Sequence, residues 1–329
     1  MKQLLSLVQR TAAFAAALFL IGISVEGCTG SRRPVVEVIP SISSDAQWLS
    51  LHVGVVEAAD KAGLEAHWSG PSEESNSSEQ IKLVDQAIER KAFGIVLEPN
   101  ALVATNKVIR KAQSHHIPVV VIAEGTGTPE GEHLYHLLND TSETGNLIAT
   151  RTRQLIHGEG DIAILGLRSE IPGNIERADA IADALRLICP NLQVIKRSME
   201  SSSTSYEQHL VREFIHSHPR VKEIVALSSQ ESFAVAAAVR SENAMQRIKI
   251  IGCDQTLPLF LMLRAGAIDS LVVQDMRTMG RLAVEIVTKD RAGLQAPQVS
   301  VVKPVLISKE NIDTEPIQQV ILMHKEVRR

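Results

Sequence analysis

Long runs of a single charge are absent from this chain of 329 residues, and so are the motifs of the common enzyme classes. The formal net charge is only −4, and the lack of a long basic run argues against a nucleic-acid partner. No Ser nucleophile elbow, His-Glu-x-x-His or Cys-x-x-Cys is present, and Gly125-Thr126-Gly127 lacks the third glycine of a phosphate loop. We therefore expect no catalytic residues and no cofactor.

Cysteine is also scarce, with only Cys28, Cys189 and Cys253 in the chain. Two cysteines beyond the N-terminal segment do not make a disulfide scaffold, although Cys189 and Cys253 could pair in an oxidising compartment. Each of these two lies beside an expected helix end or strand end, where a buried thiol is the more common state. Both alternatives stay open at this point.

Histidines offer no obvious metal site. His115 and His116 are adjacent, and His133 and His136 have the spacing of two ligands on one helix face. Neither pair has an evident third or fourth ligand, which a zinc site requires. We expect solvated histidines and no bound metal.

Residues 1–27 have the features of a secretory signal. A basic start with Lys2 and Arg10 precedes an apolar run that is too short to span a bilayer comfortably. The following Val25-Glu26-Gly27-Cys28 resembles a bacterial lipobox, from which Glu26 departs because a small or hydroxyl residue is usual there. We expect cleavage before a lipidated Cys28, a polar linker over residues 28–34, and an exported, membrane-anchored protein. An uncleaved short anchor is the alternative.

Residues 35–63 form the unit around which the rest of the chain is interpreted. The opening β-branched run is typical of a buried parallel strand. Apolar residues then recur at helical spacing from Trp48 to Gly63, where a left-handed glycine can end the helix. Ligands of open α/β sheets bind beyond the carboxyl ends of the strands, so Asp45 and Trp48 lie where a ligand would be met. A core role for Trp48 is the alternative.

The remaining chain alternates between short apolar runs and amphipathic stretches. We expect further strands at residues 94–97, 119–122, 161–165, 193–195, 223–227, 249–251 and 271–273. We expect helices at residues 77–88, 103–112, 143–156, 175–187, 206–216, 231–241 and 259–265. Ser77 and Gln80 have capping-box spacing, and the last dozen residues are expected to be a solvated tail. This alternation is typical of parallel, doubly wound α/β lobes.

With both lobes laid out, the chain resembles the type I periplasmic sugar-binding proteins, the ribose- and galactose-binding family. The segments that carry the resemblance are Gln47-Trp48-Leu49-Ser50-Leu51, Ala59-Asp60-Lys61-Ala62-Gly63, Ile117-Pro118-Val119-Val120, Asn139-Asp140, Glu176-Arg177, Ile251-Gly252-Cys253-Asp254 and Val273-Gln274. The resemblance covers nearly all of residues 35–312.

This resemblance implies two doubly wound, Rossmann-like lobes joined by three crossover strands. Lobe 1 would comprise residues 35–139 and 275–303, lobe 2 residues 140–274 and 304–313, and a C-terminal tail residues 314–329. The crossovers would lie near residues 139–141, 273–275 and 302–304. Ligand would close the cleft by a hinge motion.

The resemblance also assigns a candidate site. Trp48 matches an aromatic ring that stacks on a sugar, and Arg177 matches a guanidinium that binds sugar oxygens. Asp254 matches a carboxylate acceptor, Gln274 matches an amide, and Gln230-Glu231 falls on a motif commonly occupied by Asn-Asp. The full set of candidate ligand contacts is Asp45, Gln47, Trp48, Glu98, Glu124, Asn139, Arg177, Gln230, Asp254 and Gln274.

Three departures from the family pattern bear on the ligand. Two of them change the charge of the site, and the third removes an aromatic ring. Ala123 and Glu124 replace an Asp-Arg pair, Glu98 replaces a neutral amide, and the 201–205 loop lacks an aromatic residue. The expected site then has four carboxylates, from Glu98, Glu124, Glu231 and Asp254, against Arg177 and Arg168. Burial of uncompensated carboxylates is costly, so we expect a neutral or cationic ligand such as an amino sugar.

The resulting functional hypothesis is an extracytoplasmic solute-binding lipoprotein. A monomer would capture a sugar or sugar-like ligand and deliver it to the permease and ATPase of an ABC importer. The anchor would lie at the periplasmic face or on the outer surface of the cytoplasmic membrane. A ligand-sensing receptor that signals to a membrane kinase is the alternative. A transcription regulator would need a DNA-binding module where the signal stands.

Overall fold

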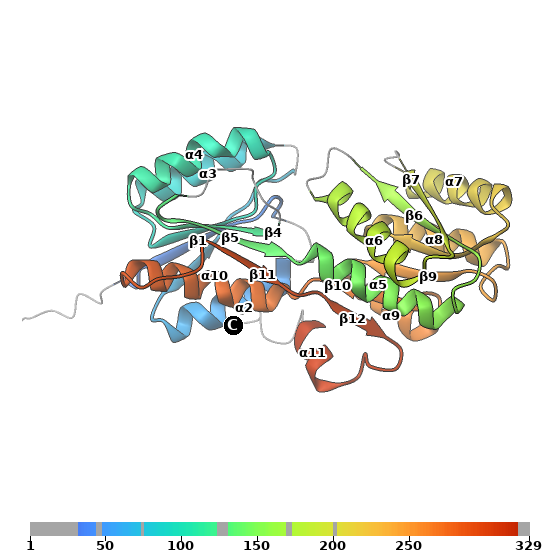
Figure 1. The fold of residues 1–329 in the computed structure, drawn as a ribbon. Coiled ribbons are helices and arrows are strands. Elements are labelled where there is room, and N and C mark those ends of the chain that lie inside the picture. Colours follow the sequence, from blue (N-terminus) through green and yellow to red (C-terminus); the bar gives the residue numbers. More distant parts are fainter. Residues whose placement is uncertain are drawn as a thin grey trace, which may run out of the picture. The chain divides into compact units, whose positions relative to one another are not determined.

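Two six-stranded sheets organise the chain, one in each of two lobes (Figure 1). The computed structural model describes residues 32–43, 48–73, 76–123, 131–168, 173–199 and 203–321. Lobe 1 contains β1 (Val35–Ile39), β2 (Glu65–Trp68), β3 (Gly94–Leu97), β4 (Val119–Ala123), β5 (Leu134–Asn139) and β11 (Val299–Val302), in the order β11-β5-β4-β3-β1-β2. Lobe 2 contains β6 (Asp161–Leu167), β7 (Gln193–Ser198), β8 (Val221–Ala226), β9 (Lys249–Cys253), β10 (Ser270–Val273) and β12 (Val305–Ser308), in the order β12-β10-β9-β8-β6-β7.

Helices connect these strands as crossovers. In lobe 1 they are α2 (Trp48–Lys61), α3 (Ser77–Glu89), α4 (Leu102–Ser114) and α10 (Met276–Arg291). In lobe 2 they are α5 (Thr141–Ile156), α6 (Asn174–Ile188), α7 (Thr204–Ser217), α8 (Ser229–Ser241), α9 (Leu257–Ala265) and α11 (Glu315–Ile321). Within the described residues the paired strands are parallel, except for β10 with β12, which are antiparallel. The predicted fold class, two doubly wound α/β lobes, is therefore confirmed.

The chain passes from one sheet to the other after β5, after β10 and after β11. The first two passages lead directly into helices, and an aspartate caps each of them. Asp140 accepts from the backbone N–H of Glu143, and Asp275 accepts from that of Thr278. A carboxylate at this position satisfies an orphan donor and complements the helix dipole. Each lobe is thus built from segments far apart in the sequence.

Each face of the lobe 1 sheet has its own apolar core, because neighbouring strand residues point to opposite faces. Val38 and Val96 pack with α2 and α10, whereas Ile39, Ile95 and Leu97 pack with α3 and α4. Figure 1 shows these two helix pairs on opposite faces of the sheet. Strands buried on both faces explain the continuous apolar runs in the sequence.

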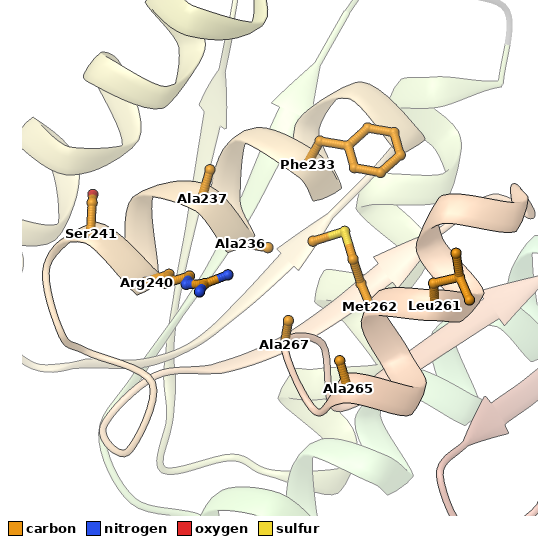
Figure 2. A pocket seen from close by; sticks show the side chains of 9 residues that line it. All are labelled: Phe233, Ala236, Ala237, Arg240, Ser241, Leu261, Met262, Ala265 and Ala267. Carbon is orange, nitrogen blue, oxygen red and sulfur yellow. The ribbon is translucent and has the colours of Figure 1, made fainter.

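A hollow of about 830 Å³ lies on lobe 2 between α8 and α9. Figure 2 shows Phe233 of α8 near Met262 of α9, with the alanines of the lining farther along the two helices and just after α9. The hollow is lined mainly by Phe233, Ala236, Ala237, Leu261, Met262, Ala265 and Ala267. None of the predicted ligand contacts lines it.

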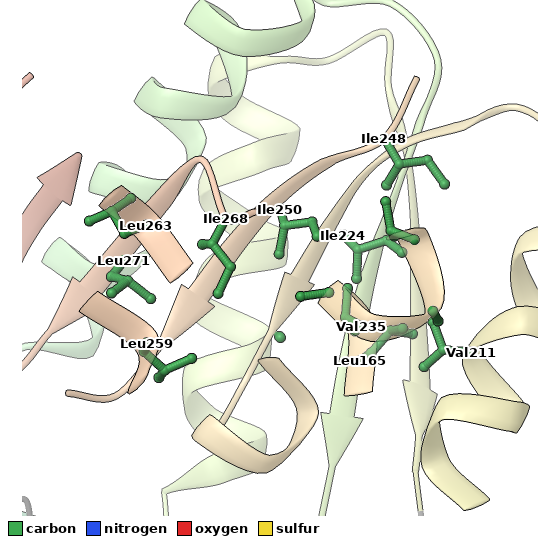
Figure 3. Packing of buried hydrophobic residues seen from close by; sticks show 14 of the residues in the cluster. Leu165, Val211, Ile224, Val235, Ile248, Ile250, Leu259, Leu263, Ile268 and Leu271 are labelled. Atoms are coloured by element: carbon green, nitrogen blue, oxygen red, sulfur yellow. The ribbon is translucent and has the colours of Figure 1, made fainter. Parts of the chain in front are cut away.

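Beneath this hollow, α8 and α9 cover one apolar face of the lobe 2 sheet. Figure 3 shows Val235 of α8 and Leu259 and Leu263 of α9 packed toward Ile224 and Ile250 of the sheet. The opposite face packs against α5 and α6. Cys189 and Cys253 lie in that second core as buried free thiols, which decides between the two alternatives for these residues.

Several elements differ from the sequence predictions. Strand β2 and helix α10 are present where we predict none, and β11 ends where the third crossover is expected. The cap of α3 is Asn76, which accepts from the backbone of Glu79, so the predicted Ser77–Gln80 capping box is wrong by one residue. Part of the expected solvated tail forms α11, whose Ile317 and Val320 are buried in the lobe 2 core.

The two candidate histidine ligands do not lie on a helix. His133 precedes β5 and His136 lies within it. His133 Nδ1 is 2.9 Å from a carboxylate oxygen of Asp290, and His136 is buried. Within the described residues no group of three or more His, Cys, Asp or Glu side chains is arranged to hold a metal ion. Nor does any described helix combine the length and the apolar character needed to cross a bilayer.

Candidate ligand-binding site

The carboxyl ends of the lobe 2 strands carry a network of polar and charged side chains. Arg168, directly after β6, donates to Oε1 of Glu231 from Nε at 3.2 Å and from Nη2 at 2.8 Å. The same Nη2 lies 3.1 Å from Oε1 of Glu207, on the first turn of α7. Gln230 donates from Nε2 to this Glu207 oxygen at 2.6 Å. The network therefore joins the β6 exit, α7 and the start of α8.

Glu231 has room in this network because Gly166 has no side chain. A Cβ at Gly166 would lie 2.5 Å from Cγ of Glu231, and the φ angle of Gly166 is +96°. The register of β6 against β7 shifts at the same place, between Leu165 and Leu167. A bulge with a left-handed glycine thus forms the space for the buried carboxylate.

Asp254 and Arg177 fix the loop that leads into α8. Asp254, immediately after β9, accepts from the backbone N–H of Ser229 at 2.8 Å. Arg177 of α6 donates to the carbonyl oxygen of Leu227 at 3.3 Å. Asp254 has a φ of +76°, and such strained non-glycine backbone is concentrated at functional sites. The structure therefore places the predicted residues Arg177, Gln230 and Asp254 around one loop of lobe 2.

In lobe 1 the predicted Glu98 interacts with the protein itself. One of its carboxylate oxygens accepts from the backbone N–H of Ser41 at 2.8 Å, across the exits of β1 and β3. Asn139 is the last residue of β5 and is partly buried. Gln274, which follows β10 in lobe 2, is also partly buried. The predicted contacts Asp45, Gln47 and Glu124, and the predicted lipidation site Cys28, lie outside the described residues.

The structure places Trp48 in the apolar core of lobe 1, which was the alternative to a ligand contact. It begins α2 and is only 2 % exposed, packed with Leu51, Val55 and Met276 among others. A ring that stacks on a sugar needs an open face, so this burial supports the core interpretation. The indole Nε1 is nevertheless buried without a hydrogen-bond partner.

Other buried polar atoms beyond the strand ends share this property. The atoms that are buried and make no hydrogen bond include the Ser69 hydroxyl after β2, both amide atoms of Asn100 after β3, both amide atoms of Gln255 after β9, and Oε1 of Gln274 after β10. Buried polar groups are normally satisfied, so each exception needs an explanation. A polar ligand beyond the strand ends would supply partners for them.

Two amide side chains that hold the exit loops are not indicated as site residues by the sequence pattern. Gln80 is fully buried in α3, donates to the carbonyl oxygens of Pro40 and Glu98, and accepts from the backbone of Asn100. Asn174, at the start of α6, accepts from the N–H of Arg168. Both hold a strand exit in place. An amide in the first turn of a crossover helix is the only sequence signal for this role.

Burial raises the pKa of several acidic groups of lobe 2, and two of them lie near the strand ends. It raises the pKa of Glu207, and the neighbouring Glu231 carboxylate raises it further. Burial also raises the pKa of the Cys253 thiol to about 12, so this cysteine stays a thiol at neutral pH and is a poor nucleophile.

Comparison with known proteins agrees with this architecture. The model of the periplasmic binding protein domain matches residues 36–292. The D-apiose import binding protein of Paraburkholderia graminis is 22 % identical over 241 residues, which cover 72 % of this chain and 76 % of that protein.

Solved structures share the fold. A solute-binding protein from Agrobacterium vitis with bound α-D-tagatopyranose superposes with a TM-score of 0.76 at 17 % identity, covering 88 % of this chain and 99 % of the other. An arabinose-binding protein from Geobacillus stearothermophilus gives a TM-score of 0.77 at 20 % identity, with 85 % and 98 % covered. Since the family model spans most of the sequence, the chain belongs to the periplasmic binding protein domain family.

Proposed function

We propose that this protein is an extracytoplasmic solute-binding protein that captures a small, neutral, polyhydroxylated ligand between its lobes for an ABC importer. Membership of the periplasmic binding protein family implies a location outside the cytoplasm. Relatives with this fold are described as binding D-apiose, D-tagatose and arabinose. These relatives are transport proteins, and we propose the same non-catalytic role for this protein.

The observation that carries the ligand class is the set of buried polar atoms without partners beyond the strand ends. They comprise an indole N–H, a hydroxyl and amide groups, from Trp48, Ser69, Asn100, Gln255 and Gln274. All of these groups are uncharged. Each sugar hydroxyl both donates and accepts, so a sugar can satisfy amide oxygens and N–H donors together.

The charged side chains named next, by contrast, each interact with another group of the protein. Arg168 lies against the carboxylates of Glu207 and Glu231, Asp254 accepts from a backbone N–H, and Glu98 does the same. A cationic ligand is therefore not needed to compensate these carboxylates. We propose a neutral sugar rather than the amino sugar that the sequence suggests.

The sheet order supports lobe boundaries close to those that the resemblance implies. We propose lobe 1 as residues 35–139 and 275–303, and lobe 2 as residues 140–274 and 304–313 together with α11, which packs in the lobe 2 core. The three passages between sheets then act as the hinge. Ligand contacts from both lobes would shift the population toward a closed form. We further propose that residues 1–27 are removed and that a lipid on Cys28 holds the protein at the membrane.

A binding screen tests this function. The mature chain is titrated by calorimetry with D-apiose, D-arabinose and D-tagatose, with glucosamine as the cationic probe and gluconate as the anionic probe. We expect a neutral sugar to bind best and to raise the melting temperature by mass action. Tightest binding of glucosamine would overturn the neutral ligand class. Absence of binding across a wider panel of neutral sugars and polyols would overturn the proposed function.

A further inference from the structure

One buried carboxyl in lobe 2 is not among the residues that the sequence suggests as ligand contacts. Glu207 lies on the first turn of α7, and its side chain is fully buried. Its oxygen Oε1 accepts from Gln230 Nε2 at 2.6 Å and from Arg168 Nη2 at 3.1 Å. A fully buried carboxyl with two such partners is a built part of the network rather than a surface residue.

We propose that Glu207 is a positioning residue of the ligand site, a protonated carboxyl that holds the Gln230 amide and the Arg168 guanidinium in place. This role rests on the proposed function, since Gln230 is a proposed ligand contact. Glu207 is also linked to Glu231, because Arg168 donates to both carboxyl groups. One residue of α7 therefore sets the arrangement of the first turn of α8.

The hydrogen-bond pattern locates the proton. Because Oε1 already accepts from two donors, the proton of a neutral Glu207 belongs on Oε2. That oxygen is buried and has no hydrogen-bond partner. An ionised oxygen left without a donor in such a place is far more costly than a neutral one.

Charge balance points the same way. Among the described residues, the groups that interact with Glu207 are Arg168 from the β6 exit and Gln230 and Glu231 from α8. Arg168 donates twice to Glu231 and once to Glu207. One guanidinium balances one carboxylate, so a second ionised carboxylate would leave a net negative charge in a buried place. Burial and the Glu231 charge both raise the pKa of Glu207.

The proton makes this part of the site dependent on pH. When Glu207 ionises at high pH, it repels Glu231 across the shared Arg168. The two carboxylates then tend to move apart, and this movement weakens the hydrogen bond between Glu207 and Gln230. We expect the first turn of α8 to loosen as the pH rises.

Hydrogen exchange of residues 228–234 in the ligand-free full chain tests the positioning role. After correction for intrinsic exchange, protection of this segment in the wild type should fall at least threefold between pH 6 and pH 9. Glu207→Gln keeps an acceptor and places an N–H₂ group where the proton is proposed, so the fall should be smaller in this variant than in the wild type. The matched control is Glu213→Gln, on the same helix with a side chain that is 65 % exposed, which should retain it.

Calorimetry with the best neutral sugar of the panel supplies the second measurement. Glu207→Ala should weaken binding by about tenfold, because it removes the oxygen to which the Gln230 amide and the Arg168 guanidinium both donate. If Glu207→Gln shows the same pH-dependent loss of protection as the wild type, the proton is not on Glu207 and the proposal is overturned. A failure of every sugar to bind, with the exchange result as expected, would overturn the proposed function and leave the positioning of Gln230 intact. Should Glu207→Ala not fold, the pH profile of Glu207→Gln still decides.

Discussion

The side chain of Glu231 occupies the space that any side chain at Gly166 would need. A Cβ at Gly166 would lie 2.5 Å from Cγ and 2.8 Å from Cδ of Glu231. The glycine belongs to β6 and the glutamate to α8, so a strand and a helix are matched at one point of the polar network. A buried carboxylate at the strand ends is possible here only because the strand bulges at a glycine.

Gly166→Ala should therefore destabilise the protein strongly. The change combines the clash with Glu231 and an unfavourable positive φ, and we expect a loss of about 3 kcal/mol in the free energy of unfolding. Gly158→Ala is the matched control, since its φ is +80° with no atom within 4 Å of the added Cβ. Urea unfolding of both variants measures the difference. Equal losses would show that the contact with Glu231 contributes nothing.

Substitutions of Trp48 distinguish a role in core packing from a role in ligand binding. Trp48→Ala removes a buried ring and should lower the free energy of unfolding by about 3–5 kcal/mol. Trp48→Phe keeps an aromatic ring but removes the unpartnered N–H, so it should cost much less stability. If that N–H meets a ligand oxygen, Trp48→Phe weakens sugar binding by about 1 kcal/mol. Unchanged affinity in Trp48→Phe would assign Trp48 to the core alone. Trp68 is the only other tryptophan in the chain. A change in tryptophan fluorescence on ligand binding therefore comes from one of only two residues.

Stability should also depend on pH through Glu223, a buried residue of β8. Burial raises its pKa from 4.5 to about 8, although Thr152 donates a hydrogen bond to it. The folded chain therefore keeps a proton that the unfolded chain loses, so the stabilising effect of this proton is complete below pH 4.5 and declines up to about pH 8.

Glu223→Gln removes this dependence. At pH 8 the variant should be more stable than the wild type by on the order of 2–4 kcal/mol, and the two should converge near pH 4. Urea midpoints measured from pH 4 to pH 9 give the comparison. Glu159→Gln, an exposed change, serves as the control. A wild-type profile that stays parallel to that of Glu223→Gln would contradict the prediction.

The proposed lipid on Cys28 has a direct test. Expressed with its own signal, the protein should fractionate with membranes, because a thioether-linked diacyl unit with a further amide-linked chain gives stable attachment. Cys28→Ser should release the protein or leave its signal unprocessed. Membrane association that persists in the mutant, with the signal cleaved, would disprove lipidation.

The alternation of strands and helices was accessible from the sequence because the core strands are buried on both faces. Runs such as residues 94–97 and 119–122 are continuously apolar, and the helices between them have one apolar face. Strand β2 is different, since Glu65–Trp68 alternates between exposed and half-buried residues at the edge of its sheet. Its identity comes from pairing with β1, which a local pattern does not contain.

Some features of the candidate site could also be predicted from the sequence, and others could not. Strand-exit positions such as Arg177, Gln230 and Asp254 follow from the order of elements and the family resemblance, and the structure gathers them around one loop. Whether a carboxylate there is uncompensated depends on neighbours that come from other elements. Arg168 and Glu207 are 39 residues apart, and only folding brings them together.

By itself, the sequence determined the two-lobed α/β class, because hydrophobic periodicity is a local property of each segment. Tertiary structure decided the burial of Trp48, the balance of charge around Arg168, and the role of Gly166 as the space for Glu231. These features depend on which atoms of distant segments meet. The free energy of a buried charge or polar group is set by those atoms and not by its own position in the chain.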